Sequence, residues 1–197
     1  MITNNFYSEQ ELKQLGLGSF GENVLISKKC SIYGASRIHI GNNVRVDDFC
    51  VLSAGKNGIY FGDYIHVGVY TSLIGDGKIS LKSFCNISSK VAIYSSNDDY
   101  TGDWMTNPMI PKEFTNVTYG NVTIDRHVII GTNSTILPNV TLNEGACVGA
   151  YSLVKDNCDA FMIYVGVPAK KTKKRSKKLL DLEKDFKKHL IIQESNK

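Results

Sequence analysis

The 197-residue sequence contains no apolar run near the roughly 20 residues that a membrane-spanning helix requires. Its first residues, MITNNFYSEQ, lack the basic and apolar segments of a secretory signal peptide. The five cysteines form no CxxC pair and no cysteine–histidine spacing typical of a metal site. These absences predict a cytoplasmic protein with reduced thiols, no stable membrane insertion and no bound metal.

Positive charge is scarce outside one short segment. The net charge is +4, but residues 169–178 (AKKTKKRSKK) hold seven of the 23 basic residues and no acid. The rest of the chain carries 16 basic and 19 acidic residues, a net charge of −3. Proteins that coat nucleic acid are basic over a broad surface, so we expect no nucleic-acid partner.

A six-residue repeat organises most of the chain. Apolar residues recur at this spacing without a miss at Ile124, Ile130, Ile136, Leu142, Val148 and Val154. An amphipathic helix is excluded, because 3.6 residues per turn would rotate the apolar face away. Short strands interrupted by turns are compatible with a period of six. We therefore predict an all-β fold, a left-handed parallel β-helix of triangular section with inward anchors, an extended loop and a C-terminal α-helix.

Small or β-branched residues tend to follow each anchor by four positions, where they would fit a tight corner. Four of the cysteines occupy this position: Cys30, Cys50, Cys85 and Cys158. Cys147 does not. The pattern predicts that the four are packing residues without a nucleophilic or metal-binding role.

The limits of the repeat divide the chain into three segments. We predict an N-terminal cap over residues 1–20, the β-helix over 21–168, and a basic segment with an amphipathic helix over 169–197. The register fails between residues 95 and 121, which predicts a long loop, and such loops are usually functional. Helical spacing of Leu179, Leu182, Phe186 and Leu190 predicts a helix that packs on the open end of the β-helix.

Two stretches carry a resemblance to a known family. HVIIGTNSTILPNVTLNEGACVGAYSLV (127–154) and IYVGVPAKK (163–171) resemble the hexapeptide-repeat acyltransferases, in an order of motifs typical of enzymes that use acetyl-CoA on sugars. ELKQLGLGSFGENVLIS and IYSSNDDYTG are most similar to enzymes that N-acetylate dTDP-4-amino-4,6-dideoxyglucose and related nucleotide sugars for surface polysaccharides such as O-antigen.

The resemblance implies a homotrimer with acetyl-CoA in the groove between neighbouring β-helices. Matched by motif, the pantetheine arm would pass the corner at Thr132 and the turn at Gly149 and Ala150. Lys155 follows the SLV motif and would also contact the cofactor, with Asp156 beside it where relatives often place Thr and then Lys. Lys170 and Lys173 would approach the phosphates at the adenine end, since point charges suit phosphates.

The residue that the resemblance leads us to expect before the long loop is missing. Sugar acetyltransferases of this type read Ile-Tyr-x-x-x-His, whereas here Ile93 and Tyr94 lead to Asp98. Histidine suits proton abstraction near neutral pH, and an aspartate is a weaker base unless burial raises its pKa. A sugar amine needs less help than a hydroxyl once it is neutral. Asp98 therefore favours an amine acceptor, which its carboxylate would also attract as an ammonium group.

Other interpretations remain open at this point. Asp98 and its neighbour Asp99 are also favoured turn residues. Asp99, Tyr100 and His66 are candidates for substrate contacts, although outward histidines such as His66 and His127 are more often ordinary surface residues. The alternative activities are O-acetylation of a sugar or polysaccharide and, in another class, a non-catalytic trimeric β-helix scaffold.

Overall fold

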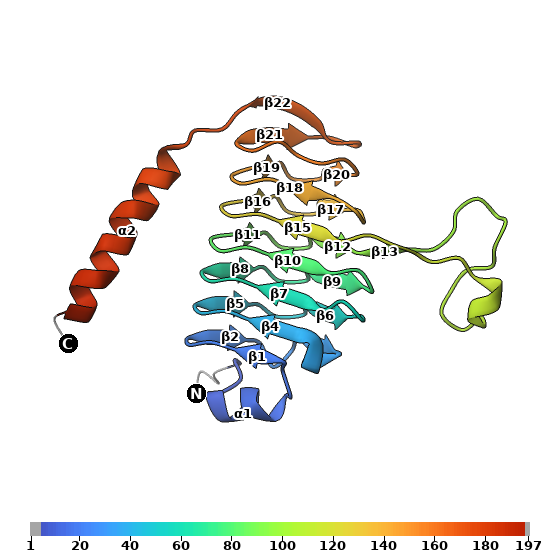
Figure 1. The fold of residues 1–197 in the computed structure, drawn as a ribbon, viewed down its shortest axis with the longest axis horizontal. Helices are drawn as coiled ribbons and strands as arrows, with labels where there is room; N and C mark the ends of the chain where they lie inside the picture. The colour runs from blue at the N-terminus through green and yellow to red at the C-terminus, as the bar shows by residue number, and fades with distance from the viewer. Residues whose placement is uncertain (1–4, 196–197) are drawn as a thin grey trace.

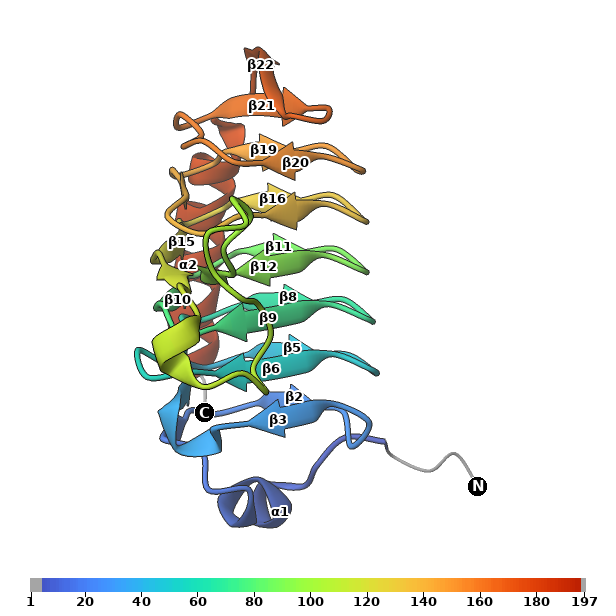
Figure 2. The same cartoon turned by 90° about the vertical axis from the view of Figure 1, so that its right-hand side faces the viewer.

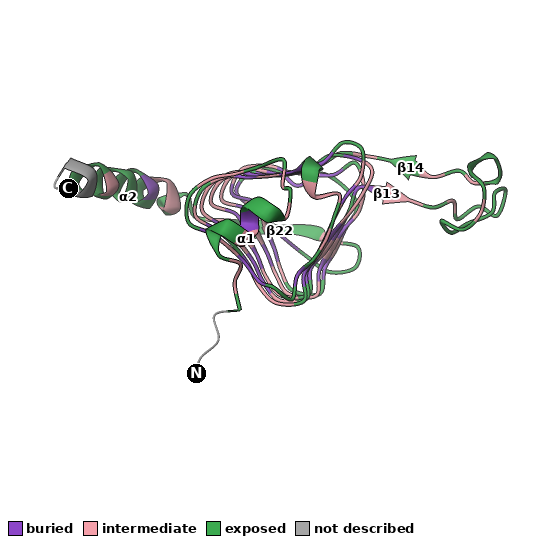
Figure 3. Ribbon diagram, turned by 90° about the horizontal axis from the view of Figure 1, so that it is seen from below, coloured by how far each residue is buried: buried purple, intermediate pink, exposed green. Residues whose placement is uncertain are grey.

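The computed structural model describes residues 5–195, with side chains up to residue 192. The chain winds through stacked coils of short parallel strands, which gives a triangular section when viewed along the axis (Figure 3). Figure 2 shows the coils stacked parallel to one another along a single axis. This is the predicted left-handed parallel β-helix.

Three parallel sheets form the faces of the triangle (Figure 1). The first sheet contains β1 (Ser19–Phe20), β4 (Ile38–Ile40), β7 (Ile59–Phe61), β10 (Ile79–Leu81), β15 (Val122–Ile124) and β18 (Thr141–Leu142). The second contains β2 (Val24–Ile26), β5 (Val44–Val46), β8 (Ile65–Val67), β11 (Asn86–Ile87), β16 (Ile129–Ile130), β19 (Cys147–Val148), β21 (Met162–Val165) and the antiparallel β22 (Lys170–Lys174). The third contains β3 (Ser31–Tyr33), β6 (Val51–Ala54), β9 (Ser72–Gly75), β12 (Ala92–Tyr94), β17 (Thr135–Ile136) and β20 (Leu153–Val154).

The remaining elements lie at the ends and corners of the β-helix. Helix α1 (Glu9–Gln14) covers the first coil, and its N-terminus is closed by a capping box between Ser8 and Glu11. The other elements are the 3-10 helices η1 (Ala35–Arg37) and η2 (Lys112–Phe114), the antiparallel pair β13 (Ser96–Asn97) and β14 (Thr118–Tyr119), and helix α2 (Lys178–Ser195). We call the passages from first to second sheet, second to third, and third to first the first, second and third corners.

The interior confirms the sequence pattern. All six anchors of the long repeat are at most 1% exposed, and the small residues that follow them are buried as well. Cys30, Cys50, Cys85 and Cys158 are buried, and burial raises the pKa of their thiols to about 12, 11, 12 and 12. Such thiols stay protonated at neutral pH, so their predicted packing role is confirmed.

The first and second corners turn through left-handed backbone conformations that repeat from coil to coil. Tyr64, Phe84 and His127 have φ values of 56°, 67° and 60° at the first corner. Their rings stack in a column with centroids 5.2 and 5.0 Å apart. Phe49 and Tyr70 stack in the same way at the second corner. Equivalent positions in successive coils are therefore direct neighbours in space.

The prediction for the C-terminal helix is wrong in its position. β22 pairs with β21 at the last coil, while α2 runs beside the β-helix along the first corner (Figure 1). The helix is fastened by Phe186, which packs edge-on against Tyr64 and Phe84, and by the buried Glu183. Leu182, predicted on the packed face, is 59% exposed. The lysines of β22 make the last strand a poor template for pairing with another chain.

Candidate functional site

An arm, residues 98–117, leaves the β-helix at the third corner and projects far from it (Figure 1). Its base is the antiparallel pair β13 and β14, in which Ser96 faces Tyr119 and Asn97 faces Thr118. The pair is anchored by the buried Ser95, whose Oγ donates a hydrogen bond to the Gly77 carbonyl at 2.7 Å. The base of the arm is therefore held in place although the arm itself is exposed.

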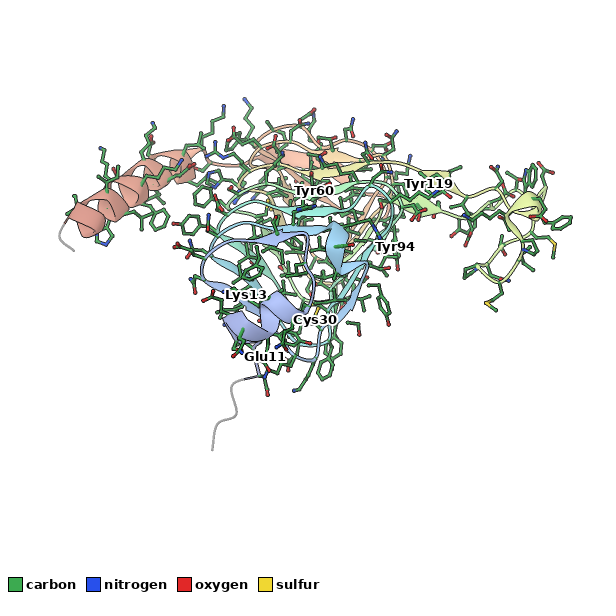
Figure 4. The ribbon with its side chains drawn as sticks, turned by 60° about the horizontal axis from the view of Figure 1, so that its bottom comes forward. Glu11, Lys13, Cys30, Tyr60, Tyr94 and Tyr119 are labelled. Atoms are coloured by element: carbon green, nitrogen blue, oxygen red, sulfur yellow. The ribbon has the colours of Figure 1, made fainter. Side chains whose placement is uncertain are left out.

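Asp98 is the first residue of this arm. Among the described residues, its exposed carboxylate makes no hydrogen bond or ion pair. It lines two hollows of about 410 Å³ each, one toward Asp76 in the preceding coil and the other toward Thr135 in the next. Tyr94 and Tyr119 lie beside the base of the arm (Figure 4). Asp98 is thus a free carboxylate between two ligand-sized spaces.

The neighbouring candidates have different surroundings. The Asp99 carboxylate accepts hydrogen bonds from the backbone N–H groups of Thr101 and Gly102 at 3.0 and 3.1 Å, and from the Thr101 hydroxyl. Asp99 therefore shapes the turn that begins the arm. Tyr100 is 85% exposed and lines the hollow toward Thr135.

His66 lies on the second sheet, a different face from Asp98 within one chain. Its Nε2 is 2.8 Å from Asp47 Oδ2, and its Nδ1 is 3.2 Å from Asn86 Oδ1. Burial raises the pKa of Asp47, but hydrogen bonds from His66 and Arg45 outweigh this effect and leave that pKa below its usual value. His66 is therefore part of a hydrogen-bonded surface cluster with Asp47 and Asn86.

His127, the other histidine considered from the sequence, fastens helix α2. Its ring stacks on Phe84, and its Nε2 is 2.6 Å from Glu183 Oε2. Sequence reasoning missed Glu183, because nothing in the sequence distinguishes it from the other acidic residues of this lysine-rich amphipathic helix.

The residues expected to contact coenzyme A are spread over two corners and the last coil. Thr132, Gly149 and Ala150 lie at the second corner, where the Thr132 hydroxyl donates to the Ser89 carbonyl at 2.6 Å. Lys155 is at the third corner, where its Nζ is 3.2 Å from Asp156 Oδ2.

Lys170 and Lys173 lie on β22 and are exposed. Within one chain, Lys155 lies at the same corner as Asp98. Thr132, Gly149 and Ala150 lie at the opposite edge of the third sheet.

Two charged residues near Asp98 were not singled out from the sequence. Arg37 and Asp76 lie at the third corner, below the base of the arm, and share a hollow of about 230 Å³ with Ser96. The available signal was the slip in the hexapeptide register around GKNG (55–58) and GDGK (75–78), which marks loops at this same corner.

Two further properties concern metals and membranes. Within residues 5–195, no group of three or more His, Cys, Asp or Glu side chains is arranged to hold a metal ion. In the same part of the chain, no helix has the length and hydrophobicity needed to cross a membrane.

Comparison with known proteins gives strong similarities over nearly the whole chain, although no family model matches. A dTDP-4-amino-4,6-dideoxy-D-glucose acyltransferase from Escherichia coli is 56% identical over 182 residues, covering 92% of this chain and 95% of the relative. A putative lipopolysaccharide biosynthesis O-acetyl transferase, WbbJ of E. coli K12, is 30% identical over 76% of this chain and 78% of its own length.

Among solved structures, the fold matches AntD, an N-acyltransferase from Bacillus cereus, with a TM-score of 0.91 and 47% identity. The match covers 95% of this chain and 99% of AntD, which was solved in complex with dTDP-4-amino-4,6-dideoxyglucose and coenzyme A. Another AntD structure contains dTDP and 3-hydroxybutyryl-CoA.

Proposed function

This chain belongs to the dTDP-4-amino-4,6-dideoxy-D-glucose acyltransferases, and we propose that it transfers an acetyl group from acetyl-CoA to the 4-amino group of that nucleotide sugar. The observation that carries the proposal is the free Asp98 carboxylate, placed between two hollows where related sugar acetyltransferases are expected to have a histidine. The relation to enzymes over nearly the full chain sets aside the non-catalytic scaffold considered from the sequence.

The chemistry follows from what a carboxylate can do for an amine. Asp98 attracts the acceptor as an ammonium ion and takes a proton from it, which leaves a neutral nucleophile. The nitrogen attacks the thioester carbonyl carbon, and the C–N bond forms as the C–S bond breaks. The coenzyme A thiolate leaves and takes up the second proton, which the nitrogen loses as the amide forms, and Asp98 releases the first proton to solvent. A sugar hydroxyl would need a stronger base, so the aspartate favours N-acylation.

Spacing in AntD supports the choice of Asp98. AntD has been solved with one serine and with one aspartate replaced, at positions ten residues apart in that chain. Near the arm, Ser88 and Asp98 have this separation, as do Ser89 and Asp99. The two chains overlap over 95% and 99% of their lengths, so their numbering differs by only a few residues. Since the Asp99 carboxylate already holds the turn, Asp98 is the better candidate.

We place acyl-CoA between neighbouring copies in a homotrimer. Asp98 and the expected contacts at Thr132, Gly149 and Ala150 lie at different corners, so one ligand reaches both sets where two copies stand side by side. Exposed aromatic side chains at the second corner support a partner there, since Phe49 and Tyr70 are 47% and 56% exposed. Lys155, Lys170 and Lys173 remain candidates for the phosphates of coenzyme A.

We further infer a cytoplasmic location, which the five unpaired cysteines support. O-Acylation is the alternative to be tested, because one relative is described as an O-acetyl transferase.

The test is a thiol-release assay with acetyl-CoA and two matched acceptors, dTDP-4-amino-4,6-dideoxyglucose and the dTDP-sugar that carries a hydroxyl at C4. We expect turnover of the amine alone, with kcat/KM at least a hundredfold lower in Asp98→Asn. Asp103→Asn removes an exposed acid further along the arm and should behave as wild type. Turnover of the hydroxyl acceptor would refute N-acylation, and an unimpaired Asp98→Asn would refute the role of Asp98.

A further inference from the structure

Exposed lysines gather at the C-terminal end of the β-helix, where β22 covers the last coil (Figure 1). Every residue of β22 is exposed, and so are Lys177 and Lys178, where the chain passes into α2. Lys170 and Lys173 are already candidates for the phosphates of coenzyme A. Lys174, Lys177 and Lys178 are not, and we call these three the terminal lysine cluster.

The direction of β22 separates the terminal lysine cluster from the coenzyme candidates. β22 runs antiparallel to β21, with Lys170 opposite Val165 and Lys174 opposite Met162. Because β21 runs from the first corner to the second, Lys170 lies at the second-corner end and Lys174 at the first-corner end. A strand rises about 3.3 Å per residue, so these ends are roughly 13 Å apart. The cluster therefore lies away from the second corner, where the pantetheine arm is expected.

Arg175 fixes the cluster to the first corner. Its Nη1 donates to the carbonyls of His127 and Gly145 at 2.7 and 3.0 Å. Its backbone N–H donates to the Phe161 carbonyl at 2.8 Å, and the Nζ of Lys177 lies 5.1 Å from the centroid of the Phe161 ring. The segment between β22 and α2 is thus held against the β-helix, and its exposed lysines project from a fixed base.

The charge of the terminal lysine cluster is not balanced by neighbouring acids. Among the described residues, no carboxylate oxygen lies within 4.0 Å of the Nζ atoms of Lys174, Lys177 and Lys178. Further along α2 the lysines do have acidic partners, as in the pair of Lys184 with Asp181 at 3.0 Å. Outside residues 169–178 the chain has a net charge of −3, so unbalanced positive charge is concentrated at this end.

An exposed apolar side chain lies beside the cluster. Leu182, which helical spacing placed on the packed face of α2, is 59% exposed. It follows Lys178 by four residues, so the two side chains are neighbours on the helix surface. Cations beside an apolar side chain suit the boundary of a lipid bilayer, where the charges meet anionic headgroups and the apolar group enters the acyl region.

A nucleic acid fits this surface less well. Proteins that bind nucleic acid combine a broad basic stripe with side chains that stack on bases or contact them. Here the positive charge is confined to one end of the molecule, and β22 (KKTKK) contains no aromatic residue.

The proposed homotrimer would strengthen contact with a flat surface. Copies in a closed trimer are related by rotation about one axis, so β-helices that stand side by side along this axis present their C-terminal ends to the same side. Three clusters then contact one plane together, and their affinities reinforce one another. This step rests on the homotrimer, whereas the cluster itself is a property of one chain.

We propose that the C-terminal end of the β-helix is a docking surface for an anionic lipid bilayer. The terminal lysine cluster contacts the phosphates of the headgroups, and Leu182 enters the interface beside it. Asp98 leaves the β-helix several coils below this end, so docking keeps the hollows around it open to solvent. The inference goes beyond acyl transfer and uses none of the residues assigned to that reaction.

Cosedimentation of the full chain with lipid vesicles tests the surface. We expect binding to phosphatidylcholine vesicles that contain about one-third phosphatidylglycerol, and none to pure phosphatidylcholine. Affinity should fall at least tenfold between about 0.1 and 0.5 M salt, because salt screens the lysines. Leu182→Ser should weaken binding at least threefold, since it removes the apolar contact and leaves the charge unchanged.

Two charge-matched triple variants locate the contact. Replacing the terminal lysine cluster by glutamine (Lys174→Gln, Lys177→Gln and Lys178→Gln together) should weaken binding to the anionic vesicles at least tenfold. The control removes the same charge at the opposite end of the β-helix, by Lys13→Gln, Lys28→Gln and Lys29→Gln together. This control should bind as wild type, and thermal unfolding curves verify that both variants are folded.

The outcomes separate docking from the other roles of a basic segment. Absence of wild-type binding to anionic vesicles, or equal losses in the two triple variants, would overturn the proposal. Tighter cluster-dependent binding to duplex DNA than to vesicles would overturn it in favour of a nucleic acid. A raised KM for acetyl-CoA in the cluster variant, without loss of vesicle binding, would assign these lysines to the coenzyme instead. Cluster-dependent vesicle binding by a protein without acyl transfer would support docking and refute only the proposed function.

Discussion

Helix α2 is held to the β-helix by Phe186 and by one buried carboxylate, Glu183, and removal of this charge should weaken the docking of the helix. The Glu183 side chain is 7% exposed and accepts hydrogen bonds from Arg126, His127 and Lys187, all at 2.5 or 2.6 Å. Glu183→Gln keeps the size of the side chain and removes its charge. The substitution therefore tests the ion pairs with little change in packing.

The expected loss of docking free energy depends on how exposed the partners of Glu183 are. Removing one member of a buried ion pair costs about 3–5 kcal/mol. Here Arg126 is 40% exposed, so water replaces part of its interaction, while His127 is 10% exposed. Lys187 lies in α2 itself, four residues after Glu183, so its pair with Glu183 does not hold the helix to the β-helix. We therefore expect about 2 kcal/mol, within the range for hydrogen bonds to charged groups. That change raises the opening equilibrium of α2 about thirtyfold.

Hydrogen exchange of α2 peptides measures this opening directly. In Glu183→Gln, exchange in α2 should rise about thirtyfold while the β-helix strands keep their protection, because α2 contacts the surface of one corner. Asp181→Asn is the control, since its partner Lys184 and Asp181 itself are 71% and 73% exposed and such pairs contribute little. Equal protection of α2 in Glu183→Gln and wild type would refute the reasoning.

Docking of α2 should weaken as the pH falls into the acid range. Burial raises the pKa of Glu183, but hydrogen bonds from Lys187 and His127 and the charge of Arg126 lower it by more, so the folded-state pKa lies below the ordinary 4.5. Such a group stabilises the docked helix fully above the unfolded-state pKa and loses this contribution as the pH falls through the folded-state value. Opening of α2 should therefore increase below pH 4.5 in wild type and change less in Glu183→Gln.

Two further predictions concern the thiols and the corners. At pH 8, a thiol reagent should rapidly modify only Cys147 among the five cysteines, because the four buried thiols have pKa values of about 11 to 12. In denaturant, all five cysteines should react. Rapid labelling of Cys85 in the folded protein would contradict this prediction. Gly131→Ala should lower the free energy of unfolding by about 1–3 kcal/mol, because its Cβ would lie 2.4 Å from the Ala150 backbone nitrogen. Gly149→Ala, whose Cβ would meet the Val165 side chain, should lose less in a denaturant titration, since that side chain can move.

The sequence predicted the interior of the β-helix well because each anchor has the same environment in every coil. Ile124 and Val154 are buried for the same reason, because each points into the interior of its coil. The six anchors of the long repeat therefore all support the same prediction. Helix α2 was predicted from its spacing but placed on the wrong surface. Its position depends on the buried Glu183 and on an aromatic column whose members are about 20 and 43 residues apart, at Tyr64, Phe84 and His127. No local pattern reports such contacts.

The candidate site was harder to predict because its groups belong to different coils. Asp98 was found from a missing histidine, which required a resemblance to known enzymes. Arg37 and Asp76 gave no such signal, yet the fold brings them into line with Asp98, since the third corner recurs once per coil at a fixed spacing. A β-helix thereby converts distance along the chain into position along one axis. The position of a charged corner residue along that axis follows from counting coils. These positions can then be compared with the order of the chemical groups along an elongated substrate such as a nucleotide sugar.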